Sequence, residues 1–229
     1  MDDPCSVEVL WIPLGAGQQV VRRSGRIFEA LSARRERRRP LDLYHSALIV
    51  HSGSDRVVVE MTPVPRTAGV ERGVVATGPV GIGFVGRLRW FRYEIRCWPG
   101  GEIPDEAEAL EPLRVSLPCD DARRLLDLVV SVPTPVWGRD SMRAGEMWNS
   151  NSVTSWVLER AGLDTAALGP PLGGRAPGWD AGIVVARRTT PRPSATTSGL
   201  QETPPMTPAA AQSCAEVSAG DRDAGAAAS

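Results

Sequence analysis

The chain has 229 residues, a length that suits one domain with or without an extension. Its formal charge of −1 gives no reason to expect a nucleic-acid or membrane partner, and no apolar run approaches the ~18 residues that span a bilayer. Four scattered cysteines and two histidines predict neither a disulfide scaffold nor a metal site, and no cofactor is expected. The acidic start, Met1-Asp2-Asp3, lacks a signal-peptide pattern, which predicts a cytoplasmic location. The sequence leaves the oligomeric state open.

The first half of the chain predicts mostly strands. Residues 7–12 form a β-rich run that ends at Pro13. Ser24 is a suitable cap for a helix that ends before Pro40. Two further β-rich runs, 41–50 and 56–62, flank a turn sequence and predict a hairpin.

The second half adds one clear strand and two helices. Alternating apolar and charged residues predict a strand over 88–98. Helical spacing of apolar residues predicts a helix capped by Asp120 or Asp121, and another from Ser150 or Ser152 to Ala161. The run 183–186 is expected to be a short final strand.

These elements predict one α+β domain over residues 1–188. Antiparallel strands in the middle and helices near the ends favour helices packed on a small twisted antiparallel sheet or half-barrel. Residues 189–229 are rich in Ala, Ser, Thr and Pro and contain no aromatic residue. Such a segment buries too little apolar surface to offset its ordering entropy, so we expect a disordered tail.

Three other signals are interpreted as structural. Residues 81–86 match the pattern G-x-G-x-x-G, but a strand follows where nucleotide binding requires a helix. The basic run 33–40 ends a predicted helix, where cations are favoured, and an anionic partner is the alternative. Cys5 is expected in a frayed segment, and Cys119 as a packed cysteine beside the charges of Asp120 and Asp121.

His45 is the better candidate for a catalytic base, because His51 falls in the predicted turn. If the hairpin folds about Ser52 and Gly53, Glu60 lies opposite His45 on the next strand. Glu60 would then orient the imidazole, the role of the third member of a catalytic triad.

The candidate nucleophile is Ser150, within Met-Trp-Asn-Ser-Asn-Ser-Val at 147–153. A serine at a helix N-terminus lies among unpaired backbone N–H groups, which stabilise an oxyanion. The same residue types are also the preferred helix caps, so a purely structural role is the alternative.

An early strand histidine followed by Asn-Ser-Asn-Ser-Val at a helix start resembles the circularly permuted papain-like superfamily, which includes lecithin–retinol acyltransferase and certain cell-wall peptidases. The resemblance covers roughly residues 41–162. It implies a permuted papain-like fold with His45 as the base and Ser150 in the position of the nucleophilic cysteine. Val153 stands where the family has an aromatic residue.

Two functions follow from this interpretation. The first is a hydrolase or acyltransferase that attacks an amide or ester through Ser150 and His45, oriented by Glu60. The second is a catalytically inactive module of the same fold that holds a peptide or protein partner. Candidate substrate-binding residues are Asn149, Asn151, Ser152, Trp148 and Trp179. For tryptophans in these loops, packing against the core is the alternative.

Overall fold

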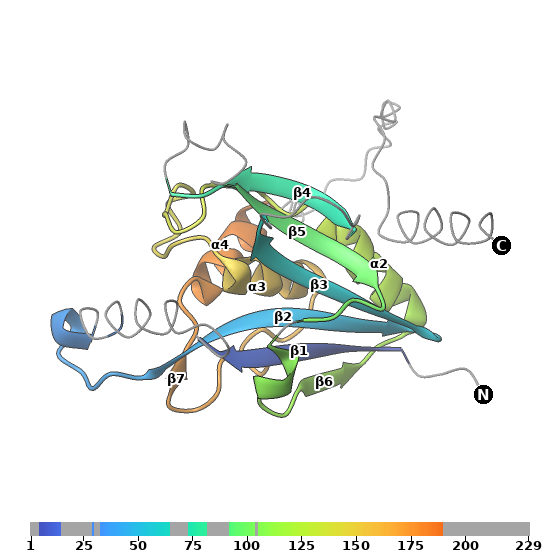
Figure 1. Cartoon of the computed structure of the whole chain (residues 1–229), viewed down its shortest axis with the longest axis horizontal. Helices are drawn as coiled ribbons and strands as arrows, with labels where there is room; N and C mark the ends of the chain where they lie inside the picture. The colour runs from blue at the N-terminus through green and yellow to red at the C-terminus, as the bar shows by residue number, and fades with distance from the viewer. Residues whose placement is uncertain are drawn as a thin grey trace, which may run out of the picture.

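The computed structural model describes residues 5–14, 29, 33–64, 73–81, 92–103 and 105–189. They form one open sheet with its longer helices on one side (Figure 1). The strands are β1 (Ser6–Pro13), β2 (Asp42–Ser52), β3 (Asp55–Pro63), β4 (Val74–Pro79), β5 (Arg92–Pro99), β6 (Leu113–Ser116) and β7 (Gly174–Arg175). The predicted α+β class is therefore confirmed.

The main sheet is antiparallel throughout, with the strand order β4-β5-β3-β2-β1-β6. The short strand β7 lies off this path and pairs in parallel with the start of β2. β2 is thus a central strand, and it carries the predicted base, His45.

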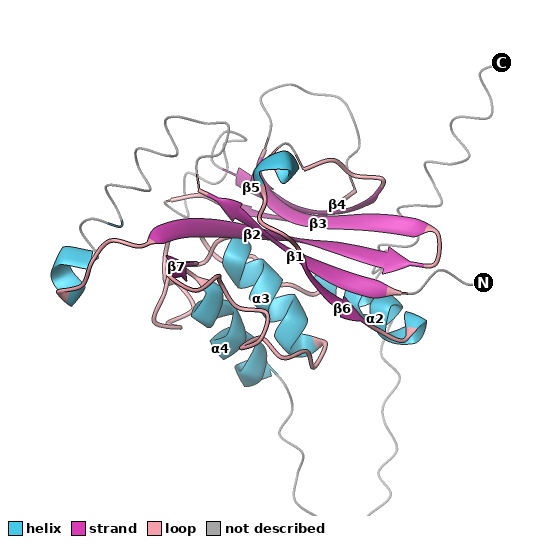
Figure 2. Ribbon diagram, turned by 90° about the horizontal axis from the view of Figure 1, so that it is seen from below, coloured by secondary structure: helices cyan, strands magenta, loops and turns pink. Residues whose placement is uncertain are grey.

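The helices are η3 (Glu106–Glu108), α2 (Cys119–Val129), α3 (Ser150–Arg160) and α4 (Trp179–Thr189). Figure 2 shows α2, α3 and α4 together on one side of the sheet. The face of the sheet toward these helices is called the helix face below, and the other the open face.

Both faces of the central strands are apolar. On the helix face, alternate residues such as Trp11, Leu48 and Val50 join the main core with the helices. On the open face, Leu10, Ile12, Ala47, Ile49 and Val58 form a smaller cluster with Ile103. Because side chains alternate along a strand, neighbouring residues of β2 belong to opposite faces.

The predicted final strand at 183–186 is wrong, because these residues lie within α4. The three β-branched residues at 183–185 favour a strand locally, but α4 buries residues at helical spacing against α3. Gly182 permits the close approach, since a Cβ there would collide with Ser155 and with the Ser152 carbonyl. Tertiary packing overrides the local propensity.

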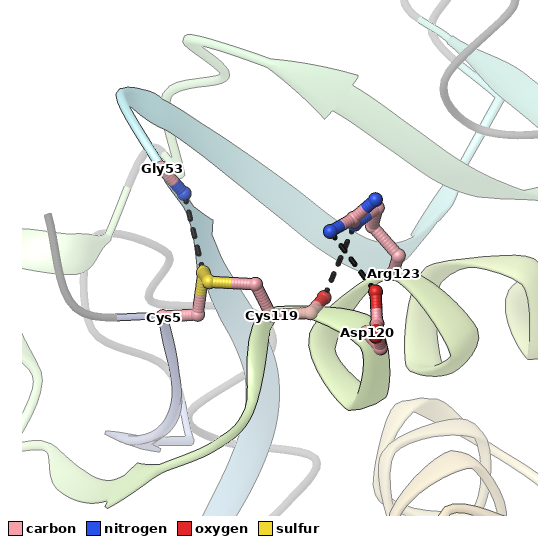
Figure 3. Close-up of a disulfide and its surroundings, with 5 residues drawn as sticks. All are labelled: Cys5, Gly53, Cys119, Asp120 and Arg123. Carbon is pink, nitrogen blue, oxygen red and sulfur yellow. Dashed lines mark hydrogen bonds and ion pairs between the residues drawn. A yellow bond between two sulfur atoms is a disulfide. The ribbon is translucent and has the colours of Figure 1, made fainter. Parts of the chain in front are cut away.

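A disulfide joins Cys5 to Cys119, and thus the start of β1 to the start of α2 (Figure 3). Cys5 is buried and its sulfur accepts a hydrogen bond from Gly53 N at 3.3 Å, so the expectation of a frayed Cys5 and a merely packed Cys119 is wrong. The bond crosses a sequence separation of 114 residues, which no local pattern predicts. Disulfides persist mainly in oxidising compartments, so this one does not favour the predicted cytoplasmic location.

The N-cap of α2 also differs from the prediction. Pro118 occupies the cap position without a side-chain bond, and Asp120 and Asp121 lie in the first turn. In the first turn their negative charges interact favourably with the helix dipole, and their side chains do not cap a backbone N–H.

Several predictions fall outside the described residues. They are most of the helix expected after Ser24, the glycine pattern beyond Gly81, the first part of the strand expected over 88–98, and the tail after Thr189. The rest of that strand is β5, and the hairpin is β2 and β3.

Candidate functional site

The start of α3, where the predicted nucleophile lies, is capped by Asn149. The Asn149 side chain accepts hydrogen bonds from the backbone N–H groups of Asn151 at 2.9 Å and Ser152 at 3.4 Å. The Ser152 hydroxyl in turn accepts from the Asn149 backbone N–H at 3.1 Å, which completes a capping box. Two of the backbone N–H groups at the start of α3, those of Asn151 and Ser152, are therefore already used within the helix cap.

Asn151 ties α3 to the sheet. Its side chain is buried, and its Oδ1 accepts from the Ser46 hydroxyl at 2.9 Å. Its Nδ2 donates to the carbonyl oxygens of Tyr44 at 3.0 Å and Pro177 at 2.9 Å. With these three bonds the amide is satisfied on both sides, as buried polar groups require.

Ser152 and Asn149 tie α3 to the segment that precedes α4. The Ser152 hydroxyl donates to the Gly178 carbonyl at 2.8 Å, and Asn149 Nδ2 donates to the Pro177 carbonyl at 2.7 Å. Gly178 has a φ of +88°, and a Cβ there would lie 2.6 Å from Asn149 Oδ1. Glycine is needed at this position for both reasons. The side chains of Asn149, Asn151 and Ser152, together with Ser46, are called the polar knot below.

Three of the predicted binding residues have a structural role in the polar knot. The hydrogen-bonding groups of Asn149, Asn151 and Ser152 join α3 to β2 and to the loop before α4, and Asn151 and Ser152 are buried. They hold the scaffold and do not point polar groups at a substrate.

His45 lies on the open face of the sheet, away from α3. It pairs with Ile12 on β1, and it shares the face of Ala47 and Ile49 by strand alternation. The residue of β2 that contacts the start of α3 is its neighbour, Ser46. The structure thus separates His45 from Ser150 by the sheet, and the predicted catalytic pair does not form.

His45 is half-buried in the sheet. Desolvation lowers the pKa of His45, and the negative charge of Asp105 partly opposes this effect. Asp105 directly precedes η3, in the segment of the open face that supplies Ile103. His45 is therefore held in its neutral form among residues remote from Ser150.

The predicted pairing of Glu60 with His45 is also wrong. The hairpin pairs Leu48 with Val59 and Ser52 with Asp55, a register that brings Glu60 closer to Ala47 than to His45. The turn is Gly53-Ser54, one residue later than expected. Glu60 instead pairs with Arg96 of β5, at 3.2 Å between Arg96 Nη1 and Glu60 Oε1.

The two candidate tryptophans belong to the core. Trp148 and Trp179 have exposed fractions of 1% and 5%, and the Trp179 ring packs 5.0 Å from that of Trp11. Trp137, in the neighbouring loop, meets Tyr93 edge to face. The alternative interpretation of these residues, packing of loops against the core, is the one the structure supports.

Ser150 itself is the first residue of α3 and is partly buried. No described residue forms a hydrogen bond with its hydroxyl.

Other features of the described residues add no ligand site. In that part of the chain no group of three or more His, Cys, Asp or Glu is placed to hold a metal ion. None of its helices is long and apolar enough to cross a membrane.

Comparison with known proteins identifies no relative. No protein-family model matches the chain, and neither a curated protein nor a solved structure shows significant similarity to it.

Proposed function

We propose that this domain is a non-catalytic module that binds a peptide or protein partner. The observation that supports it is the identity of the β2 residue facing the start of α3, which is Ser46 instead of a histidine. Any relationship to permuted papain-like enzymes is, in this proposal, one of architecture and not of chemistry.

A serine hydroxyl has a high pKa and reacts only when a positioned base removes its proton. Ser46 offers a second hydroxyl, not a base, and its bond to Asn151 Oδ1 already uses its proton. His45 is directed to the opposite face. Ser150 therefore has no imidazole to activate it, since the other histidine, His51, is opposite Ser6 on β1 and contacts Glu8.

Catalysis of acyl transfer also needs hydrogen-bond donors that stabilise the oxyanion of the tetrahedral intermediate. At the start of α3 the N–H groups of Asn151 and Ser152 bond to Asn149 Oδ1. An incoming substrate would have to displace this cap, which typically contributes about 1 kcal/mol to stability.

The test is covalent labelling of the full chain with a fluorophosphonate probe, with peptide mapping of any adduct. We expect no adduct on Ser150, and no difference between the wild type and Ser150→Ala in ester and amide hydrolysis. His45→Ala is the matched control on the other face of the sheet.

A fluorophosphonate adduct on Ser150, with hydrolysis that Ser150→Ala abolishes, would overturn the proposal. It would restore the hydrolase hypothesis with a base other than His45. Loss of the same activity in His45→Ala would further require the two residues to meet in solution.

A further inference from the structure

The turn that precedes β2 is the C-terminal end of a short helix. Residues 33–36 are helical, Arg38 N donates to the Ala33 carbonyl at 3.0 Å, and Arg37 N donates to the Arg34 carbonyl at 3.3 Å. This pair of bonds is the Schellman motif, in which the residue after the helix takes a left-handed conformation. That residue is Arg37, with a φ of 54°.

A buried carboxylate holds this turn in place. Glu29, with an exposed fraction of 2%, accepts bonds from the Arg38 guanidinium and, at 2.9 Å, from Leu41 N. Nη1 of Arg175 in β7 lies 3.8 Å from Glu29 Oε2 and 3.3 Å from Glu36 Oε1. The hydrogen bond from Arg38 lowers the pKa of Glu29, so the anchor stays charged at neutral pH.

Four arginines on this turn are exposed and form no ion pair within the described part of the chain. Arg38 and Arg175 pair with the carboxylates at this corner. The other arginines of the turn have no ion pair with any carboxylate in the described part of the chain. They are Arg34, Arg35, Arg37 and Arg39, and are called the arginine corner below. Figure 1 places their helical turn just before the start of β2, at one extreme of the sheet.

Arg37 occupies a conformation that favours glycine. A left-handed backbone costs an ordinary L-residue roughly 1–2 kcal/mol, and glycine is the usual residue at this position of the motif. The chain uses glycine for the same purpose after α3, where Gly162 has a φ of +78°. An arginine kept in a strained position points to a use for its side chain.

We propose that the arginine corner binds an acidic segment of a protein partner. This inference rests on the proposed binding function and names the chemistry of the partner. A guanidinium pairs with a carboxylate through two parallel hydrogen bonds, and the four side chains extend from a turn that Glu29 has already ordered. Binding then costs little further ordering of the backbone.

A protein segment fits the surface better than a nucleic acid does. The corner is short and is bordered by the exposed Asp42 at the start of β2, which would repel a polyphosphate that extends along the strand. Single-stranded nucleic acids also bind through stacking on aromatic side chains. The described residues 33–42 include no aromatic residue.

The test is fluorescence anisotropy of a labelled polyglutamate peptide with the full chain at low ionic strength. We expect saturable binding that weakens as salt is added. Arg34→Gln/Arg35→Gln should weaken it about tenfold, because exposed ion pairs contribute modestly and roughly additively. The matched control is Arg123→Gln/Arg124→Gln, which removes two exposed arginines of α2 that pair with Asp120 and Asp121. The control should bind as the wild type does.

Arg37→Gly separates binding from folding. It removes one guanidinium and relieves the left-handed strain, so we expect weaker binding together with a higher melting temperature. A purely structural arginine would show no loss of binding.

The absence of polyglutamate binding, or an equal loss in the α2 control, would overturn the inference. Equal or tighter binding of a single-stranded RNA oligomer would overturn the choice of a protein partner. These outcomes are independent of fluorophosphonate labelling at Ser150, so failure of the inference is distinguishable from failure of the proposed function.

Discussion

The polar knot and the arginine corner are both dense in polar residues, yet they differ in what their side chains contact. In the knot, Asn151 makes three hydrogen bonds inside the protein and is buried. At the corner, Arg34 and Arg35 are exposed and have no ion pair with a described carboxylate. Groups already satisfied by the fold stabilise it, and groups that the fold presents to solvent without partners remain available for binding.

The largest loss of stability is expected from a change outside both regions, at the disulfide, and the effects of changes within the two regions can be compared with it. Cys5→Ser/Cys119→Ser removes a bond that closes a separation of 114 residues. We expect a loss of roughly 4 kcal/mol in the free energy of unfolding, from the loop-closure entropy restored to the unfolded chain. Denaturant unfolding of the wild type and the double variant, both without a reducing agent, measures it. An unchanged midpoint in the double variant would contradict the prediction.

Asn151→Ala tests the polar knot directly. The change leaves the Ser46 hydroxyl and the Tyr44 carbonyl without their buried partner, and we expect a loss of about 3 kcal/mol. Urea unfolding measures it, with Ser150→Ala as the neighbouring control. That control should stay within about 0.5 kcal/mol of the wild type. A larger effect of Ser150→Ala than of Asn151→Ala would reverse the structural assignment of the two residues.

Arg37→Gly tests the arginine corner in the opposite direction. We expect an increase in stability of about 1 kcal/mol, because glycine adopts the left-handed conformation without a Cβ clash. The same urea experiment measures it. A destabilised variant would mean that the Arg37 side chain supports the fold and would weaken the contrast between the two regions.

The smallest expected effect is a dependence of stability on pH through His45. Burial lowers the pKa of His45 below its ordinary value of 6.5, so the unfolded chain binds the proton more readily than the folded one. The contribution to stability is therefore fully present above pH 6.5 and is lost as the pH falls toward the folded pKa. His45→Gln should flatten the curve of unfolding free energy against pH in this window.

The anchor of the arginine corner responds to a lower pH range. The pKa of Glu29 is lowered from 4.5 by Arg38, so its contribution is present above pH 4.5 and is lost on further acidification. His45→Gln should leave that lower transition unchanged. A shift of both transitions in this variant would show that the two groups are coupled.

Local patterns predicted most of the elements that the structure describes. The turn residues around Gly53 specified the hairpin of β2 and β3, and the alternation of Tyr93, Ile95 and Cys97 specified the inward face of β5. The start of α3 at Ser150 and its end before Gly162 were likewise readable, because caps and left-handed glycines act within a few residues.

The candidate site was less predictable because pairing between strands depends on the position of the turn. The hairpin turn was expected one residue early, which changes the pairing by two residues and brings Glu60 opposite Ala47 instead of His45. The helical segment 183–186 was missed because its β-branched residues favour a strand unless α3 packs against them.

By itself the sequence determined that His45 and Ser46 point to opposite faces of one strand, since side chains alternate with a period of two. Only the tertiary structure decided which of these faces carries α3. Both faces of β2 are apolar, with Ala47 and Ile49 on one and Leu48 and Val50 on the other, so hydrophobicity does not distinguish them. The hydrogen bond between Ser46 and Asn151, two residues 105 positions apart, shows that α3 packs on the face of Ser46.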